Sequence, residues 1–135
     1  MIVVDSSAVV AIALREVGYR RLAQRIADEP GATISVANYV ESGQVLARRQ
    51  LHDPQQALTE FHGLLRRLNI DLAPIDEAQA RIALQARIRY GRGFGHRARL
   101  NYSDCFAYAL AKARDLPLLF VGDDFTHTDV ISALA

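Results

Sequence analysis

The stretch LNYSDCFAYALAK, residues 100–112, places one acidic residue at the start of a nearly apolar helix. From Cys105 to Ala111 the chain has no polar face, so the pattern predicts a helix that is buried on all sides. Either Ser103 or Asn101 is a suitable N-cap for it. Because the helix dipole favours a carboxylate in the first turn, Asp104 by itself is compatible with a purely structural role. Its function has to be judged from the rest of the chain.

Composition indicates one folded domain, residues 1–135, in a chain that is 50% hydrophobic and 23% charged. Sixteen Lys and Arg residues oppose 15 Asp and Glu residues, so any affinity for nucleic acid must come from local clusters. The single cysteine excludes an internal disulfide and a cysteine-built zinc site. No basic segment precedes the apolar N-terminus, and no apolar run approaches the roughly 18 residues of a membrane span. We therefore expect a soluble, cytoplasmic protein.

The order of elements predicts a three-layer α/β/α sandwich around a central parallel sheet. Short apolar runs predict strands at residues 2–4, 32–35, 70–72 and 118–121. Helices are expected at residues 6–14, 19–27, 36–51, 54–68 and 76–90 and in the stretch after residue 100, and the tail from residue 125 suits an edge strand or a helical turn. Helical segments between successive strands are typical of a parallel sheet that is covered on both faces.

Five acidic residues are predicted to meet at one edge of this sheet. Asp5 follows the first strand, Asp123 and Asp124 follow the last strand, and Glu41 and Asp104 lie near the starts of helices. In open parallel sheets, the crevice outside the carboxyl ends of the strands is where ligands bind. Clustered carboxylates repel one another unless a cation neutralises them, and oxygen-only ligands favour Mg²⁺ or Mn²⁺. Taken singly, each acid also suits a structural position: a strand end, a helix surface or a turn.

Basic residues cluster just before Asp104, in a segment that also contains several aromatic residues. This arrangement predicts a surface for an RNA backbone and for stacked bases, although a solvated loop would have the same composition. A second basic group occupies the pair of helices after residue 36 and suits either a solvated face or a contact with a protein partner. Cys105 is expected to be buried and inert, and the histidines at 52, 62 and 127 are expected at the surface. The first cluster consists of Arg87, Arg89, Arg92, His96, Arg97 and Arg99 with Tyr90, Phe94 and Tyr102, and the second of Arg48, Arg49, Arg66 and Arg67.

The sequence resembles the PIN-domain ribonucleases and, within them, the VapC toxins of bacterial toxin–antitoxin pairs. The resemblance rests on four segments in the family's order and spacing: IVVDSSAVVAI (2–12), ISVANYVESGQVL (34–46), LNYSDCFAYALAKARDLPLLFVGDDF (100–125) and TDV (128–130). It implies an α/β/α fold whose site is a quartet of acids that binds Mg²⁺ or Mn²⁺.

The matched motifs assign the acids residue by residue. Asp5, Glu41 and Asp104 fall on the first three positions of the quartet. Many relatives have an asparagine at the position of Asp123, followed by an aspartate, so Asp124 is the predicted fourth acid and Asp123 a candidate in the outer shell. Supporting roles fall to a hydroxyl facing the metal-bound water and an amide near the site, which match Ser6 and Asn38.

The sequence thus predicts a metal-dependent endoribonuclease in which Asp5 and Asp104 hold the principal ion directly, while Glu41 and Asp124 act through water or recruit a second ion. RNA contacts are assigned to Arg92, His96, Arg97 and Arg99. By resemblance the partner is a VapB-type antitoxin, the toxin forms a homodimer, and operator DNA binding belongs to the antitoxin.

Two other classes of function compete with this prediction. One is a non-catalytic module that binds RNA or protein, in which the acids serve only an oligomer or a partner contact. The other is a phosphohydrolase of the haloacid dehalogenase type, suggested by Asp5 at a strand end and by Asp123 and Asp129 near the C-terminus. The latter needs a second aspartate two residues after the first, and Ser7 stands there instead.

Overall fold

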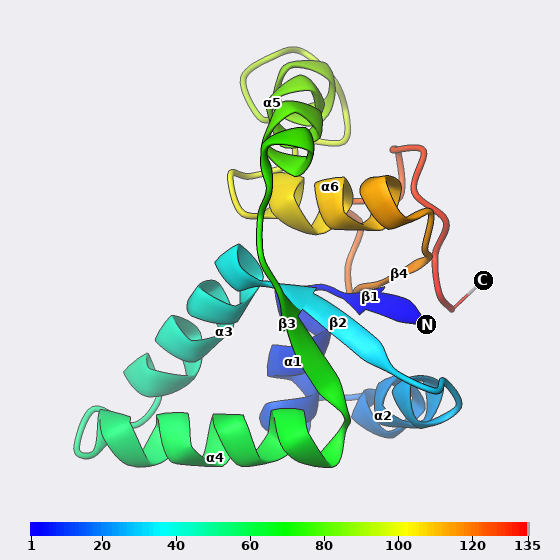
Figure 1. Cartoon of the computed structure of the whole chain (residues 1–135). Helices are drawn as coiled ribbons and strands as arrows, with labels where there is room; N and C mark the ends of the chain where they lie inside the picture. The colour runs from blue at the N-terminus through cyan, green and yellow to red at the C-terminus, as the bar shows by residue number, and fades with distance from the viewer. Residues whose placement is uncertain (135) are drawn as a thin grey trace.

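The computed structural model describes residues 1–134, which form four strands and six helices in three layers (Figure 1). All strand pairs are parallel, in the order β3-β2-β1-β4. The predicted α/β/α sandwich with a parallel sheet is therefore confirmed. In chain order the elements are β1 (Ile2–Val4), α1 (Ser6–Ala13), α2 (Tyr19–Ala27), β2 (Ala32–Ser35), α3 (Val36–Arg48), α4 (Pro54–Arg67), β3 (Ile70–Ala73), α5 (Glu77–Tyr90), α6 (Asp104–Arg114) and β4 (Leu118–Leu119).

The sheet separates two hydrophobic cores because successive strand residues point to opposite faces. Ile2 and Val4 pack with α1 to α4, whereas Val3 packs with α5 and α6. In Figure 1, α5 and α6 lie above the sheet, and α1, α2 and α4 lie below it. Within residues 1–134, no helix combines the length and the apolar character needed to cross a membrane.

Helix α6 is the buried helix that the sequence predicts. Cys105 and residues 107–111 are buried, and Phe106 is partly buried and packs against the same hydrophobic core. Its cap comes from Asn101, whose Oδ1 accepts a hydrogen bond from the Asp104 backbone N–H at 2.9 Å. Ser103 occupies the N-cap position but its side chain makes no capping bond. Of the two predicted caps, the structure uses Asn101.

Two predicted boundaries differ from the structure by more than one residue. The helix expected to reach residue 51 ends at Arg48, and a turn leaves Leu51 exposed before Asp53 caps α4. The last strand ends at Leu119, because the Val121 N–H donates to the Ser7 hydroxyl instead of extending the ladder. The tail forms a single parallel bridge, between Leu118 and Ser132, at the free edge of β4.

Candidate active site

Asp5 lies at the carboxyl end of β1 and caps helix α1. Its Oδ2 accepts hydrogen bonds from the Ser7 backbone N–H at 3.0 Å and from the Ser7 hydroxyl at 2.6 Å. The side chain is buried, and its Oδ1 has no partner in the described structure. Burial raises the pKa of Asp5 to about 6, and the charge of Glu41 adds to this, although the hydrogen bonds from Ser7 oppose it. An unpartnered, buried carboxylate oxygen is a position that a cation would satisfy.

Asp104 opens α6 and faces the same crevice. Its Oδ2 accepts a hydrogen bond from the Asn101 backbone N–H at 3.0 Å, so Asn101 and Asp104 cap each other reciprocally. The side chain is 6% exposed. Burial raises the pKa of Asp104 to about 7, and the charges of Asp5, Asp124 and Glu41 raise it further. The charges of the other three predicted acids therefore all act on Asp104.

Glu41 reaches the crevice from the second turn of α3. Its carboxylate accepts a hydrogen bond from the Ser103 hydroxyl, which comes from the loop before α6. From the sequence, Ser103 and Asn101 are predicted only as helix caps, and Ser7 is given no role at the site. Ser7 and Asn101 each lie within three residues of the acid that they orient. Ser103 instead binds Glu41 from 62 residues away, a contact that no local pattern contains.

Asn38 and Ser6 form the floor of the crevice. The Asn38 amide donates to the Ser103 carbonyl at 3.0 Å, and the Ser6 hydroxyl donates to the Asn38 carbonyl at 3.2 Å. Asn38 is completely buried and its Oδ1 has no partner in residues 1–134. These bonds join α1, α3 and the start of α6. The Ser6 hydroxyl donates inside the protein and keeps its acceptor lone pairs, so its role beside a metal-bound water stays a prediction.

Asp123 and Asp124 lie on the loop after β4 and are both exposed. Gly122 begins this loop with φ +94°, a conformation that favours glycine. Asp124 acts on the pKa of Asp104, and Asp123 is not among the charges that do so. This difference favours Asp124 as the fourth acid, with Asp123 further from the centre.

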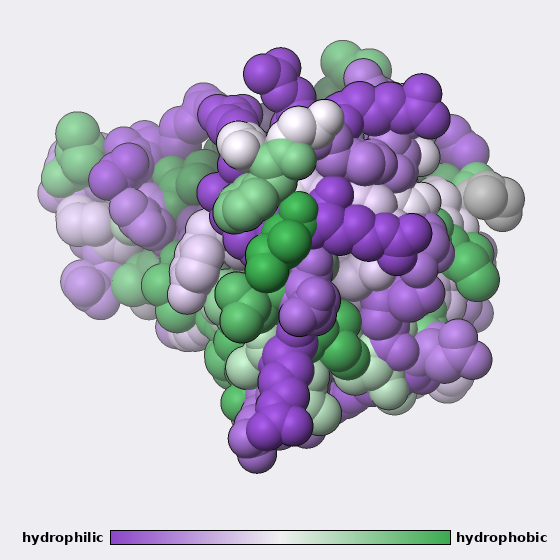
Figure 2. Space-filling model, turned by 90° about the horizontal axis from the view of Figure 1, so that it is seen from above, coloured by the Kyte–Doolittle hydropathy of each residue, from purple (hydrophilic) through white to green (hydrophobic). Residues whose placement is uncertain are grey.

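The basic segment forms a closed loop between α5 and α6. Gly91 and Leu100 pair at its base, and the Arg87 guanidinium donates to the Leu100 carbonyl at 2.7 Å. Arg92, Arg97 and Arg99 are exposed, as is Phe94. Figure 2, which looks down on the molecule from above, shows hydrophilic side chains bordering a narrow band of hydrophobic ones.

Two histidines have roles that the sequence did not predict. His96 contacts the Tyr90 ring edge-on, with ring centroids 5.0 Å apart, and its Nδ1 accepts from the Ala98 N–H at 3.0 Å. It thus supports the loop from inside. His62, predicted at the surface, is partly buried and its Nε2 lies 2.6 Å from the Tyr39 hydroxyl. Cys105 is buried as predicted, and burial raises the pKa of its thiol to about 11, so it is unreactive at neutral pH.

The acids fit a hard divalent cation. All the candidate metal ligands are carboxylate oxygens, and the Asp5 Oδ1 has no hydrogen-bond partner among the described residues. The pKa values of Asp5 and Asp104 are raised, and a bound cation would lower them by stabilising the ionised carboxylates. Within residues 1–134, no three Asp, Glu, His or Cys side chains already lie at ligating distance from one point. This arrangement suits Mg²⁺, which keeps several waters and takes few protein ligands directly.

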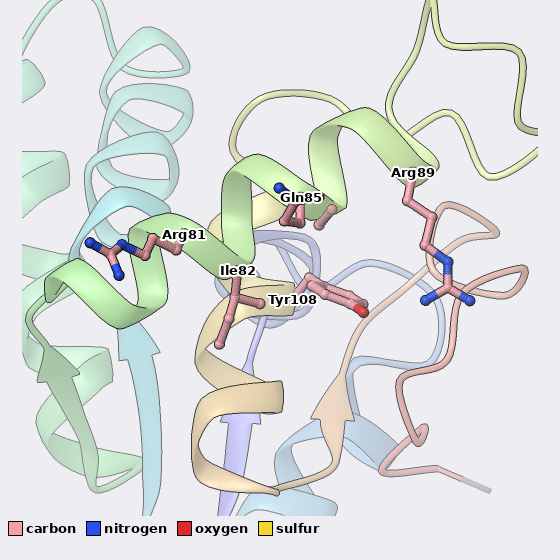
Figure 3. Close-up of a pocket in the computed structure, with 6 residues that line it drawn as sticks. Arg81, Ile82, Gln85, Arg89 and Tyr108 are labelled. Carbon is pink, nitrogen blue, oxygen red and sulfur yellow. The ribbon is translucent and has the colours of Figure 1, made fainter.

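The quartet acids lie outside two surface cavities that the described residues form. A cavity of about 450 Å³ lies between α1, α2, α3 and α4, and one of about 410 Å³ lies beside α5. Figure 3 shows the second, with Arg81, Ile82, Gln85, Arg89 and Tyr108 around it. Neither includes any of the quartet acids.

The fold and the crevice define a class: an α/β/α protein with a carboxylate cluster suited to a divalent metal at the carboxyl edge of a parallel sheet. The model of the PIN domain family matches residues 2–131. The chain belongs to the PIN-domain family, and its curated relatives are VapC ribonucleases.

One curated relative and two solved structures illustrate the similarity. Ribonuclease VapC42 of Mycobacterium tuberculosis is 43% identical over 128 residues, which covers 95% of each protein. The fold is similar to the crystal structure of M. tuberculosis VapC20, titled a sarcin-ricin loop cleaving toxin, with TM-score 0.73, 16% identity and 97% coverage of each chain. It is also similar to a chain of a toxin–antitoxin complex from Klebsiella pneumoniae, with TM-score 0.69, 17% identity and 98% coverage of each. The predicted family is confirmed.

Proposed function

We propose that this chain is a Mg²⁺-dependent endoribonuclease, with Mn²⁺ as a substitute ion, acting as the toxin of a VapBC-type pair in the cytoplasm. The observation that carries the proposal is that Asp5 and Asp104 are buried carboxyl groups with raised pKa values, on which the charges of Glu41 and, for Asp104, Asp124 also act. The VapC ribonucleases among its relatives support the same class of reaction.

The chain's own residues define what each acid contributes. Asp5 and Asp104 are buried and hydrogen-bonded, so they would hold the ion directly in a fixed geometry. Glu41 and the exposed Asp124 would bind through water or recruit a second ion. The bound ion supplies an activated water and neutralises charge on the phosphodiester. Ser7 and Asn101 orient the two buried carboxylates through their hydrogen bonds.

RNA would lie across the open crevice and the basic loop. Arg92, Arg97 and Arg99 are exposed on the loop and suit phosphate contacts, and exposed Phe94 suits stacking on a base. His96 was predicted among these contacts, and we now assign it to loop support on the basis of its internal hydrogen bond.

The cavity between α1, α2, α3 and α4 is the proposed antitoxin contact. Its floor is apolar, and its rim carries three arginines against one glutamate. An antitoxin segment with apolar residues on one face and acidic residues on its border fits this pattern. The toxin–antitoxin complex among the similar structures provides a precedent for such a partner. The arginines are Arg15, Arg49 and Arg67, and the glutamate is Glu60.

The toxin is also proposed to form a homodimer, and DNA binding is assigned to the antitoxin alone. Exposed apolar residues on and beside α5, including Leu84, Ile88 and Tyr102, form a surface suited to a second copy. Light scattering of the antitoxin-free toxin tests the mass, with a monomer at all concentrations as the result that would contradict a dimer.

The deciding experiment is cleavage of total RNA by antitoxin-free protein with Mg²⁺, with EDTA and with Asp104→Asn, followed by mapping of the cut ends. We expect discrete cuts that disappear in both controls. A folded protein that cuts no RNA in any lane would favour a non-catalytic binding module. The dehalogenase alternative has no structural support, because Ser7 binds Asp5 where that chemistry needs an acid.

A further inference from the structure

Asp129, five residues beyond the proposed fourth acid, binds three side chains of α5 and α6. Its Oδ1 accepts hydrogen bonds from the Tyr108 hydroxyl at 2.6 Å and from the Tyr90 hydroxyl at 3.4 Å. Its Oδ2 lies 3.1 Å from the Lys112 ammonium group. In Figure 3, Tyr108 extends from α6 beneath α5, toward the side where the C-terminal segment lies. Asp129 has no role in the proposed cleavage chemistry.

Two of these partners lie on the helix face that also carries a site acid. Asp104, Tyr108 and Lys112 are spaced by four residues along α6, so they form one row on its surface. Asp129 is therefore attached to the same rigid helix that holds Asp104 in the crevice.

The segment between Val121 and Asp129 needs such an attachment. Asp123 and Asp124 are exposed, and Gly122 gives the backbone freedom just before them. At its beginning the segment is held by the hydrogen bond from the Val121 N–H to Ser7 at 3.0 Å, and in its middle by the buried Phe125. Asp129 provides the third point of attachment, at its end.

We propose that Asp129 is a positioning residue, which fixes the loop bearing Asp124 relative to Asp104 through Tyr108 and Lys112. The inference rests on the proposed function, because it concerns the geometry of the same metal site. Partial burial alone would raise the pKa of Asp129, but the hydrogen bonds from Tyr108 and Lys112 hold it below its ordinary value, so the acceptor stays ionised at neutral pH.

The test compares Asp129→Ala and Tyr108→Phe with a matched acid that lacks these contacts. Asp115 is exposed at the end of α6, with φ +53°, which asparagine also tolerates, so Asp115→Asn is the control. Calorimetric titration of the metal-free proteins with Mn²⁺ should show affinity about tenfold weaker for Asp129→Ala, less weakened for Tyr108→Phe and unchanged for the control. Amide hydrogen exchange in residues 122–126 should accelerate in the same order.

A double-mutant cycle separates positioning from general destabilisation. If Asp129 acts through Asp124, then adding Asp129→Ala to Asp124→Asn leaves Mn²⁺ affinity unchanged, although it weakens the wild type. An equal loss in both backgrounds, or no change in either titration or exchange, would overturn the proposal. Wild-type protein that binds no Mn²⁺ and cuts no RNA would instead overturn the proposed function. If Asp129→Ala lowers the fraction of folded protein, Tyr108→Phe replaces it in the same double-mutant cycle.

Discussion

The two halves of the acidic crevice are held in opposite ways. Asp5 and Asp104 are buried, and each is oriented by a residue two or three positions away, Ser7 or Asn101. Asp124 is exposed on a loop that is held by two distant contacts. One joins Val121 to Ser7, 114 residues earlier, and the other joins Asp129 to Tyr108 of α6. The buried half is built by local sequence and the exposed half by tertiary contacts, so the two halves should respond differently to mutation.

The largest effect is expected where the buried half is altered. Asp104→Asn keeps the volume and the helix start but removes a charge that would hold the ion. We expect cleavage to fall by about 10³-fold or more, because the metal contributes several kcal/mol to transition-state stabilisation. Single-turnover cleavage of a mapped RNA substrate measures this. Circular dichroism should show the wild-type fold, and activity within tenfold of wild type would contradict the assignment.

The burial of Asp5 also predicts an unusual stability profile for metal-free protein. Its folded pKa of about 6 lies above the ordinary value of 3.8, so the folded state binds the proton more tightly than the unfolded state does. Its contribution to stability is therefore complete below about pH 4 and is lost as the pH rises through 6. In EDTA at pH 8, Asp5→Asn should be more stable than wild type by on the order of 2 kcal/mol.

Urea unfolding at pH 4, 6 and 8 in EDTA checks this prediction. The difference in free energy of unfolding between Asp5→Asn and wild type should be smallest at pH 4. At pH 8, added Mg²⁺ should reduce this difference because it stabilises the wild type alone. A variant that is less stable than wild type at pH 8 would show that the ionised carboxylate is not destabilising in the crevice.

The exposed half should give smaller and unequal effects. Asp124→Asn is expected to lower the cleavage rate about tenfold to a hundredfold, and Asp123→Asn to lower it by a few-fold at most. The reason is that, of these two residues, only Asp124 raises the pKa of Asp104. Titrating Mg²⁺ separates the two, since Asp124→Asn should need more metal for half-maximal cleavage. The reverse order of the two variants would make Asp123 the fourth acid.

This contrast explains how much could be predicted from the sequence. The sheet, its helices and the buried acids follow from patterns within a few residues, such as the apolar helix after Asp104 and the strand before Asp5. The contact of Ser7 with Val121 and the contact of Asp129 with Tyr108 join residues that lie 114 and 21 positions apart, and no local pattern contains them. The predicted end of the last strand was wrong for the same reason. The apolar run predicts a strand to Val121, but the hydrogen bond from the Val121 N–H to Ser7 ends the strand earlier.

The smallest expected effect concerns the basic loop, which lies outside the acidic crevice. Replacing Arg97 and Arg99 with Ala removes two exposed positive charges while Gly91, Leu100 and the Arg87 contact keep the loop closed. In an Asp104→Asn background that does not cut the RNA, we expect RNA affinity at low salt to fall several-fold, and by no more than about tenfold. The slope of log affinity against log salt should decrease in magnitude by about 1.4 to 1.8, which is roughly 0.7 to 0.9 for each of the two lost phosphate contacts. Arg20→Ala with Arg21→Ala is the matched control, because α2 lies on the opposite side of the sheet (Figure 1). Mn²⁺ affinity should be unchanged in both double variants, since these arginines bind phosphate and not the ion. An equal loss of RNA affinity in the control would mean that the loop is simply a solvated surface and that RNA is held by the crevice alone.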